Sequence, residues 1–445
     1  MIVRGQILMG ALMPHPPIVV PEVGGRELAR VAATRQAMQE VARRVAESQP
    51  EVLIVFSPHA PAMWDAIPLL APARFRGSLA GFGHPEVAME WDPDGELIRA
   101  ISREAEARQV PVRLLDEQHI LRQTDSTLDH GLAVPLYYLA RAGVECRLAA
   151  TGIGFLGRDQ LVVFGEAVRT AVAGLGRRAV LVASGDLSHR LQPGAPAGYH
   201  PDAHLFDERL VQALREDNRQ AVLEIEEQLA EKAGECGFRP LLMLLGALAG
   251  TGLRPHVRSY EGPFGVGYAV VEWASPPSWP VRLALQSLET YLREGRVLAP
   301  PPDVPPELPE RAGAFVSLKK AGELRGCIGT IEPTRMNLGE EIVYNAISAG
   351  TRDPRFPPVR LEELPELECS VDVLEPAEPV HGFGELDPRR YGVIVRKGHR
   401  TGLLLPDLEG VDTVEQQVAI ARQKAGIRPG EGDVELFRFR VTRYR

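Results

Sequence analysis

Apolar runs that end at a histidine mark the first half of the chain. The segments GALMPHP (10–16) and VLIVFSPH (52–59) each close on a histidine beside a proline, His15 and His59. Such uninterrupted apolar runs are typical of strands buried on both faces, as in parallel sheets. Residues 25–48 between them place apolar side chains at roughly helical spacing,. The pattern predicts strand, helix, strand, and a right-handed crossover would bring both imidazoles to one sheet edge.

The same alternation of strand and helix patterns continues to about residue 275. We predict further strands at 66–70, 144–152, 178–183 and 267–271, and helices at 94–108, 130–143, 160–175, 200–218, 219–232 and 239–249,. The glycine-dotted segment 75–84 is expected to form a loop,. The strand at 178–183 runs into SGDLSH, so a third histidine, His189, follows a strand end. These patterns indicate an α/β domain.

A change of composition near residue 275 separates a second domain. Residues 275–280 are rich in proline, and 445 residues exceed what one hydrophobic core usually serves,. Beyond them, strand patterns recur at 314–318, 370–374, 393–396 and 434–442, and helix patterns at 281–294, 337–348 and 413–424,. We therefore expect an α/β domain over residues 1–275 and an α+β domain over residues 276–445.

Charge and cysteine content narrow the class of protein. With 59 acidic against 50 basic residues the formal charge is -9, which argues against a nucleic-acid or anionic-membrane binder and favours small molecules or proteins as partners,. No apolar run is long enough to span a bilayer, and the first residues lead straight into a strand pattern, so a cytoplasmic location is expected,. The four cysteines show no paired spacing, which indicates reduced thiols,.

Three strand-terminal histidines together suggest a metal site, although each alone is more often a hydrogen-bonded loop residue. Two imidazoles and one carboxylate would form a facial triad with positions left open for substrate and dioxygen. The candidate carboxylates are Glu235 in AGECGFRPLL and Glu261 in SYEGPFG. Glu235 precedes an apolar helix pattern, so capping that helix is the competing interpretation of its position.

The motifs that carry these residues resemble the class III extradiol dioxygenases of the LigB type and their relatives, the Memo proteins. The resemblance spans residues 6–273 through MPHPPI, SPHAP, LDHGLAVPLYYL, ASGDLSHRL, GECGFRPLLMLLGAL and GPFGVGY. It implies a central mixed, mostly parallel sheet flanked by helices, with His15 and His59 as the paired metal histidines. Glu235 matches the carboxylate ligand of the dioxygenases, and Cys236 matches a cysteine of the Memo proteins. Both residues are present, so either would complete the metal shell, with Glu235 preferred.

The resemblance also implies roles for three further residues and a choice of function. His189 matches an acid/base histidine outside the metal shell, Asp186 the acid that accompanies it, and His130 a substrate-pocket histidine. The implied reaction is iron(II)-dependent ring cleavage of a catechol-like small molecule. The alternative is a Memo-type iron- or copper-binding protein without ring cleavage, since a thiolate ligand favours softer ions such as copper or zinc.

A second resemblance covers residues 278–444. RGCIG (325–329), AGTRDPRFPPV (349–359), ELECSVDVL (366–374), GLLLP (402–406) and QKAGI (423–427) are similar to the AMMECR domain family. In many prokaryotes such domains occur with Memo-like proteins and a radical S-adenosylmethionine protein, which is therefore an expected partner.

Within this second domain we expect one cleft that serves a common pathway with the first. Its expected residues share a charged or thiol side chain within the two motifs: Arg325, Cys327, Arg352, Asp353 and Arg355. A tight structural turn at RGCIG is the competing interpretation. Arg325 beside Cys327 would favour the thiolate.

Overall fold

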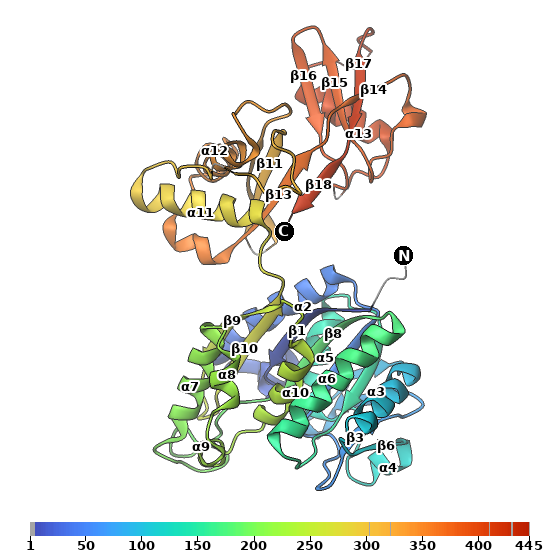
Figure 1. The fold of residues 1–445 in the computed structure, drawn as a ribbon, viewed down its shortest axis with the longest axis vertical. Coiled ribbons are helices and arrows are strands. Elements are labelled where there is room, and N and C mark those ends of the chain that lie inside the picture. Colours follow the sequence, from blue (N-terminus) through green and yellow to red (C-terminus); the bar gives the residue numbers. More distant parts are fainter. Residues whose placement is uncertain (1–4, 302, 321, 409, 429, 445) are drawn as a thin grey trace. The chain divides into compact units, whose positions relative to one another are not determined.

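The chain folds as two compact units, Met1–Pro276 and Pro277–Arg445 (Figure 1). The computed structural model describes residues 5–301, 303–320, 322–408, 410–428 and 430–444. Among these residues, no helix has both the length and the apolar character needed to cross a membrane.

An eight-stranded sheet forms the centre of the first unit. Its strands lie in the order β6 (Val112–Leu115), β3 (Ile67–Leu70), β7 (Arg147–Thr151), β2 (Val52–Phe56), β8 (Arg178–Ser184), β1 (Gln6–Met13), β10 (Tyr268–Ala274) and β9 (Arg254–Glu261). The pairs β6–β3, β7–β2, β2–β8 and β8–β1 are parallel, and the other three are antiparallel. The expectation of a mixed, mostly parallel sheet is confirmed.

Helices cover both faces of this sheet because its strands are apolar on both faces. The helices are α1 (Pro21–Gly24), α2 (Ala32–Ser48), α3 (Gly95–Ala107), α4 (Glu117–Leu121), α5 (His130–Arg141), α6 (Arg158–Leu175), α7 (Ala203–Arg215), α8 (Arg219–Leu223), α9 (Glu227–Ala233) and α10 (Phe238–Leu248), with 3-10 helices η1 (Pro17–Val19), η2 (Gly25–Val31) and η3 (Ala80–Phe82). Ile54 and Phe56 pack with α3, α6, α7 and α10, whereas Leu53 and Val55 pack with α2 and α5. This alternation is the period-two pattern of a strand buried on both sides.

The predicted loop at 75–84 is wrong. Residues there belong to an antiparallel hairpin of β4 (Phe75–Leu79) and β5 (His84–Trp91), with η3 between the strands. Gly77 does not mark a turn: a Cβ at this position would lie 2.4 Å from the carbonyl oxygen of Leu128, so the glycine permits close backbone packing,. The predicted helix at 219–232 is likewise interrupted and forms α8 and α9.

The second unit contains two antiparallel four-stranded sheets. One has the order β12 (Glu323–Gly329), β11 (Ala314–Lys320), β13 (Leu367–Leu374) and β18 (Val441–Tyr444), and the other β14 (Glu378–Val380), β17 (Glu435–Phe439), β15 (Gly392–Lys397) and β16 (Arg400–Leu404). The helices are α11 (Trp279–Glu294), α12 (Leu338–Thr351) and α13 (Val414–Lys424), with 3-10 turns η4 (Leu361–Glu366) and η5 (Phe383–Glu385). Helices α11 and α12 pack on the first sheet and α13 on the second, which confirms the α+β expectation.

The RGCIG motif lies inside strand β12, so it is not a turn. A Cβ at Gly326 would lie 2.2 Å from the carbonyl oxygen of Ala349 in α12, and a Cβ at Gly329 would lie 2.2 Å from the ring of Phe315. Both glycines therefore serve close packing of strand against helix and ring, and neither has a positive φ.

Candidate metal centre

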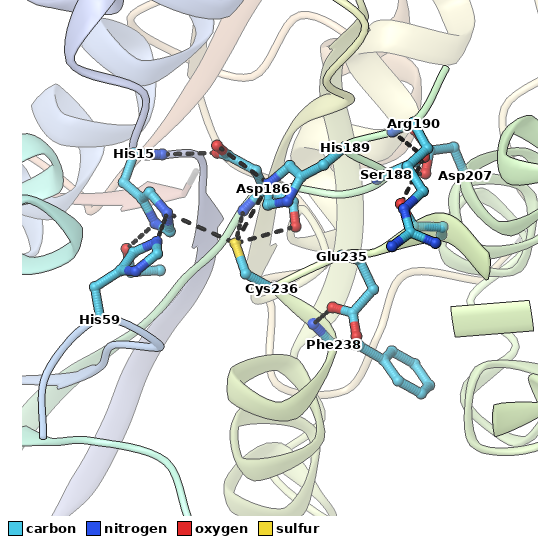
Figure 2. A network of polar contacts seen from close by, with 12 residues as sticks. His15, His59, Asp186, Ser188, His189, Arg190, Asp207, Glu235, Cys236 and Phe238 are labelled. Carbon is cyan, nitrogen blue, oxygen red and sulfur yellow. Dashed lines mark hydrogen bonds and ion pairs between the residues drawn. The ribbon is translucent and has the colours of Figure 1, made fainter. Parts of the chain in front are cut away.

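His15, His59 and Cys236 converge at one edge of the eight-stranded sheet (Figure 2). The Nε2 atoms of the two histidines are 3.0 Å apart, and the Sγ atom of Cys236 lies 3.6 Å from Nε2 of His15. One ligand atom from each of the three residues falls within 4.8 Å of the others. Among the described residues, this is the group with the geometry to hold one metal ion.

Two features of the fold bring the cluster together: parallel strands that end at one edge, and a close contact between two loops. Strand β8 lies between β1 and β2 and pairs Ser184 with Met13 and Ala183 with Phe56, so all three strands end at the same edge. His15 and His59 follow β1 and β2. The loop after β8 then touches the loop before α10: a Cβ at Gly185 would lie 2.1 Å from the Cα of Gly237. Because neither loop carries a side chain there, Cys236 is brought beside the histidines.

A hydrogen bond fixes which nitrogen of His15 is available. The hydroxyl of Ser184 donates to the carbonyl oxygen of Gly131, so its oxygen accepts from Nδ1–H of His15, 2.8 Å away. The proton is therefore on Nδ1, and the Nε2 lone pair points at His59 and Cys236. Burial and the neighbouring histidines hold the pKa of His15 well below its usual value, which keeps the ring neutral and able to act as a ligand,.

The donor set and its spacing fit a single transition-metal ion. An ion bonded to nitrogen at about 2.05 Å and sulfur at about 2.3 Å in tetrahedral geometry separates nitrogen from nitrogen by about 3.3 Å and nitrogen from sulfur by about 3.6 Å. The measured separations are 3.0 and 3.6 Å. Burial raises the pKa of the Cys236 thiol well above its usual value. A bound cation would reverse that effect, since a coordinating thiol is deprotonated.

Glu235 does not join this cluster, contrary to our preference for it as third ligand. Its carboxylate turns away from the histidines (Figure 2) and accepts a hydrogen bond of 2.6 Å from the backbone N–H of Phe238, the first residue of α10. The unpaired N–H groups of a helix start attract a carboxylate, which is the capping interpretation. Glu261 is not part of the ligand group either, and its carboxylate accepts from the N–H and hydroxyl of Thr34. The geometry therefore favours the alternative ligand, Cys236.

Asp186 and His189 flank the cluster without belonging to the ligand group. An oxygen of Asp186 accepts from the backbone N–H of His15 at 3.0 Å, and its other oxygen lies 3.9 Å from Nε2 of His189. Burial raises the pKa of Asp186 to about 7 and lowers the pKa of His189. His189 Nε2 is also 3.8 Å from the Cys236 sulfur. The predicted acid/base pair is thus placed beside the metal ligands.

His130 opens α5 and stacks at a tilt on His59, with ring centroids 4.2 Å apart. Phe82, from the β4–β5 hairpin, packs edge-on against His130 with centroids 5.5 Å apart. Asp129 precedes His130 and accepts from Ser57 and from the first N–H groups of α5. Sequence reasoning expected His130 here but missed Phe82, because that hairpin was interpreted as a loop.

A buried carboxylate behind the loop that carries Asp186 and His189 was also missed. Asp207 in α7 accepts from the backbone N–H of Ser188 and from the hydroxyl of Tyr260, both at 2.8 Å. Its only sequence signal was an acidic residue on the apolar face of a helix. The bond from Ser188 holds the loop at a point between Asp186 and His189, and the bond from Tyr260 ties the same carboxylate to β9.

In the second unit, only some of the residues that were expected to share a cleft contact one another. Asp353 accepts from the N–H of Cys327 at 2.8 Å, and Arg355 pairs with Asp353 at 2.7 Å and donates to the carbonyl oxygen of Cys327. Arg325 instead forms a two-pronged ion pair with Glu363, and Arg352 is the exposed residue after α12. Among the described residues, the guanidinium of Arg325 is thus engaged by a carboxylate and makes no hydrogen bond to the thiol.

Comparison with known proteins agrees with this division. Residues 9–271 match the model of the catalytic LigB subunit of aromatic ring-opening dioxygenases, and residues 281–444 match the AMMECR1 model. A Clostridium acetobutylicum protein is 40% identical over 98% of both chains. A Thermotoga maritima protein is 57% identical over 37% of this chain and 96% of its own. A solved structure of a Pyrococcus horikoshii protein is 38% identical, covers 37% of this chain and 88% of its own, and has a TM-score of 0.35.

The two matches lie on the two structural units, and one relative shares the whole arrangement. The chain belongs to the LigB family, as a fusion of a LigB-family, Memo-like domain with an AMMECR1 domain.

Proposed function

We propose that the LigB-family domain binds one transition-metal ion through His15, His59 and Cys236 and acts as a metal-dependent oxidoreductase on a small molecule. The observation that carries this proposal is the approach of two Nε2 atoms and one Sγ atom within 4.8 Å of one another. Two imidazoles and a thiolate favour iron, copper or zinc over magnesium or calcium. Iron remains the expected metal, with copper or zinc as alternatives.

The residues around the cluster have separate tasks in this proposal. Ser184 holds the His15 ring with Nε2 toward the ion, and Asp186 holds the backbone of the same histidine. His189, close to the ligands but outside their group, would exchange a proton with a bound substrate,. When bound, the ion supplies Lewis acidity and, for iron or copper, one-electron chemistry.

Ring cleavage of a catechol-like substrate is a second candidate, favoured by the family match over residues 9–271. The thiol in place of the carboxylate favours metal binding of the Memo type without ring cleavage. Oxygen uptake with a panel of catechols, measured on anaerobically purified, iron-loaded protein, separates the two. Uptake that requires His189 supports ring cleavage, and its absence across the panel counts against ring cleavage of these catechols.

Adjacent substitutions test the ligand set directly. Cys236→Ser should abolish tight binding of one ion per chain and remove thiolate-to-metal charge-transfer absorption from the cobalt(II)-loaded protein. Glu235→Gln is the matched control, because it keeps an acceptor for the N–H of Phe238 and should leave affinity and absorption unchanged. Metal content and absorption spectra are the measurements. Loss of metal in Glu235→Gln with retention in Cys236→Ser would overturn the assignment.

A further inference from the structure

The first turn of α5 lies beside both histidines of the candidate metal centre. Asp129 is the residue before this helix, and Gly131 is its second residue. His130 between them places its ring 4.2 Å from the ring of His59 and 5.5 Å from the ring of His15, centroid to centroid. The same short segment is therefore close to both of the proposed nitrogen ligands.

His59 depends on its backbone for its position. Its side chain is exposed, whereas the side chain of His15 is buried. In the part of the chain that the structure describes, the His59 ring has one polar contact, between its Nε2 and Nε2 of His15. The backbone N–H of His59 donates to the hydroxyl oxygen of Ser57 at 3.3 Å, and that hydroxyl donates to Asp129 at 3.0 Å. Asp129 thus acts on His59 through Ser57.

His15 is connected to the same turn through a second serine. Its Nδ1–H donates to the hydroxyl oxygen of Ser184 at 2.8 Å, and that hydroxyl donates to the carbonyl oxygen of Gly131. The N–H of Gly131 in turn donates to the carboxylate of Asp129 at 2.7 Å. The carboxylate oxygen that accepts from Gly131 is the one that accepts from Ser57. One oxygen atom therefore joins the supports of both imidazoles.

Packing against this network, and not backbone conformation, requires a glycine at position 131. The φ angle of Gly131 is not positive. A Cβ there would lie 2.5 Å from the hydroxyl oxygen of Ser57, 2.8 Å from the carboxylate of Asp129 and 3.4 Å from Cδ2 of His59. The first two separations are too short for a carbon atom, so a methyl group would displace the hydrogen-bonded groups. The space beside the turn is thus occupied by the support of His59.

We propose that the first turn of α5 positions the metal ligands, with Asp129 setting the place of His59 and Gly131 that of His15. This inference rests on the proposed function, in which both histidines bind one ion. Asp129 and Gly131 are positioning residues, because neither contacts the ion and each acts through a serine hydroxyl. Groups that orient metal ligands in this way are typically worth about 10- to 100-fold in metal affinity.

Two substitutions of Asp129 in the full chain test the hydrogen bonds. Asp129→Ala removes the shared acceptor, so affinity for cobalt(II) should fall about 10- to 100-fold, and the visible absorption of the bound ion should change with the arrangement of its ligands. Asp129→Asn keeps an oxygen that accepts from Ser57 and Gly131, so it should restore affinity and absorption to nearly those of the wild type. Competition with a chelator gives the affinities.

Gly131→Ala tests the packing without removing any polar group. Its methyl group should displace Ser57 and lower affinity for cobalt(II) by about 10-fold or more,. Gly95→Ala is the matched control, because Gly95 also lies in the first turn of a helix behind a capping aspartate, and a Cβ there would meet only the flexible side chain of Arg99, at 3.3 Å. This control should bind cobalt(II) like the wild type.

Loss of a helix cap needs its own control, because Asp129 also caps α5. Asp116→Ala removes the aspartate that caps α4 through the N–H of His119, outside this network, and should leave metal affinity unchanged. Urea unfolding of each metal-free variant measures its stability. If affinity falls in every variant in step with stability, Asp116→Ala included, the role of Asp129 is merely structural and the proposal fails.

Cys236→Ser, measured beside these variants, separates failure of this proposal from failure of the metal assignment. Loss of the ion in Cys236→Ser, with wild-type affinity and absorption in Asp129→Ala and Gly131→Ala, would overturn the positioning role and leave the ligands as assigned. Equal losses in Asp129→Asn and Asp129→Ala would also overturn it, since asparagine keeps the acceptor. A wild-type chain that binds no ion would overturn the metal assignment and, with it, the positioning role.

Discussion

Replacing Asp207 with asparagine should make the stability of the LigB-family domain less dependent on pH. Asp207 is fully buried, and burial raises its pKa from 3.8 to about 7. Its two hydrogen bonds come from the N–H of Ser188 and the hydroxyl of Tyr260. Asparagine preserves both contacts, because its carbonyl oxygen accepts from Ser188 and its amide donates to the Tyr260 oxygen. The substitution therefore mainly removes the ability of the side chain at position 207 to ionise.

The sign of the effect follows from the direction of the shift. Between pH 3.8 and about 7 the folded state holds the Asp207 proton more tightly than the unfolded state does, so the wild-type protein loses stability as pH rises through this window,. At about 1.4 kcal/mol per pKa unit, the loss is about 4 kcal/mol over the whole window, of which about 2.5 kcal/mol falls between pH 5 and pH 8. Asp207→Asn lacks this loss. Between pH 5 and pH 8, the free energy of unfolding of the variant should therefore rise relative to that of the wild type by about 2.5 kcal/mol.

Urea unfolding of the metal-free chain at several pH values measures this difference. Tryptophan fluorescence reports mainly on the LigB-family domain, which contains three of the four tryptophans: Trp64, Trp91 and Trp273. Glu145→Gln is the control, because it removes the same charge from an exposed position outside α7. If the stability difference between Asp207→Asn and the wild type does not vary with pH, Asp207 is ionised throughout and its two donors offset the cost of burial.

Two further substitutions each test one contact, the first in the LigB-family domain and the second in the AMMECR1 domain. Ser184→Ala removes the acceptor that orients His15, so metal affinity should fall about 10- to 100-fold while the fold persists,; titration with a competing chelator measures this, and unchanged affinity would show that Ser184 does not orient the ring. Gly326→Ala places a Cβ against the carbonyl oxygen of Ala349 and should destabilise the AMMECR1 domain by about 1–3 kcal/mol,. Gly382→Ala, with open space around it, is the control, and equal unfolding midpoints would refute the packing argument.

The strands of the first domain were predictable because burial on both faces leaves a strong local pattern. VLIVF ends at Phe56 with every residue buried, and His59 follows within the same loop. Parallel pairing then fixes where such loops meet. The hairpin β4–β5 lacks this signal, because only two positions of each strand are buried and neither strand alternates regularly between buried and exposed positions. Phe82 was consequently not expected beside His130.

Which of Glu235 and Cys236 belongs to the ligand group depends on where each side chain points, and their places in the sequence do not reveal this. Both residues belong to the loop before α10, and a carboxylate is the more common partner of two histidines in an iron site. The free N–H of Phe238 competes for the same carboxylate and binds it. Once Glu235 turns toward the helix, the next side chain in the loop faces the histidines. The residues of the loop were therefore predictable, but the ligand was not.

The direction of the Arg325 side chain could not be predicted for a different reason, a single irregularity in the pairing of strand β12. The guanidinium was expected beside the thiol because Arg325 is close to Cys327 in the sequence. On a regular strand, two residues two positions apart would indeed share a face. Strand β12 pairs Gly326 with Leu318 but Leu324 with Lys319, which leaves Arg325 as an extra, unpaired residue. Such a bulge changes the face of the residues before it. Arg325 therefore reaches Glu363 and the carbonyl oxygens of Pro357 and Pro358.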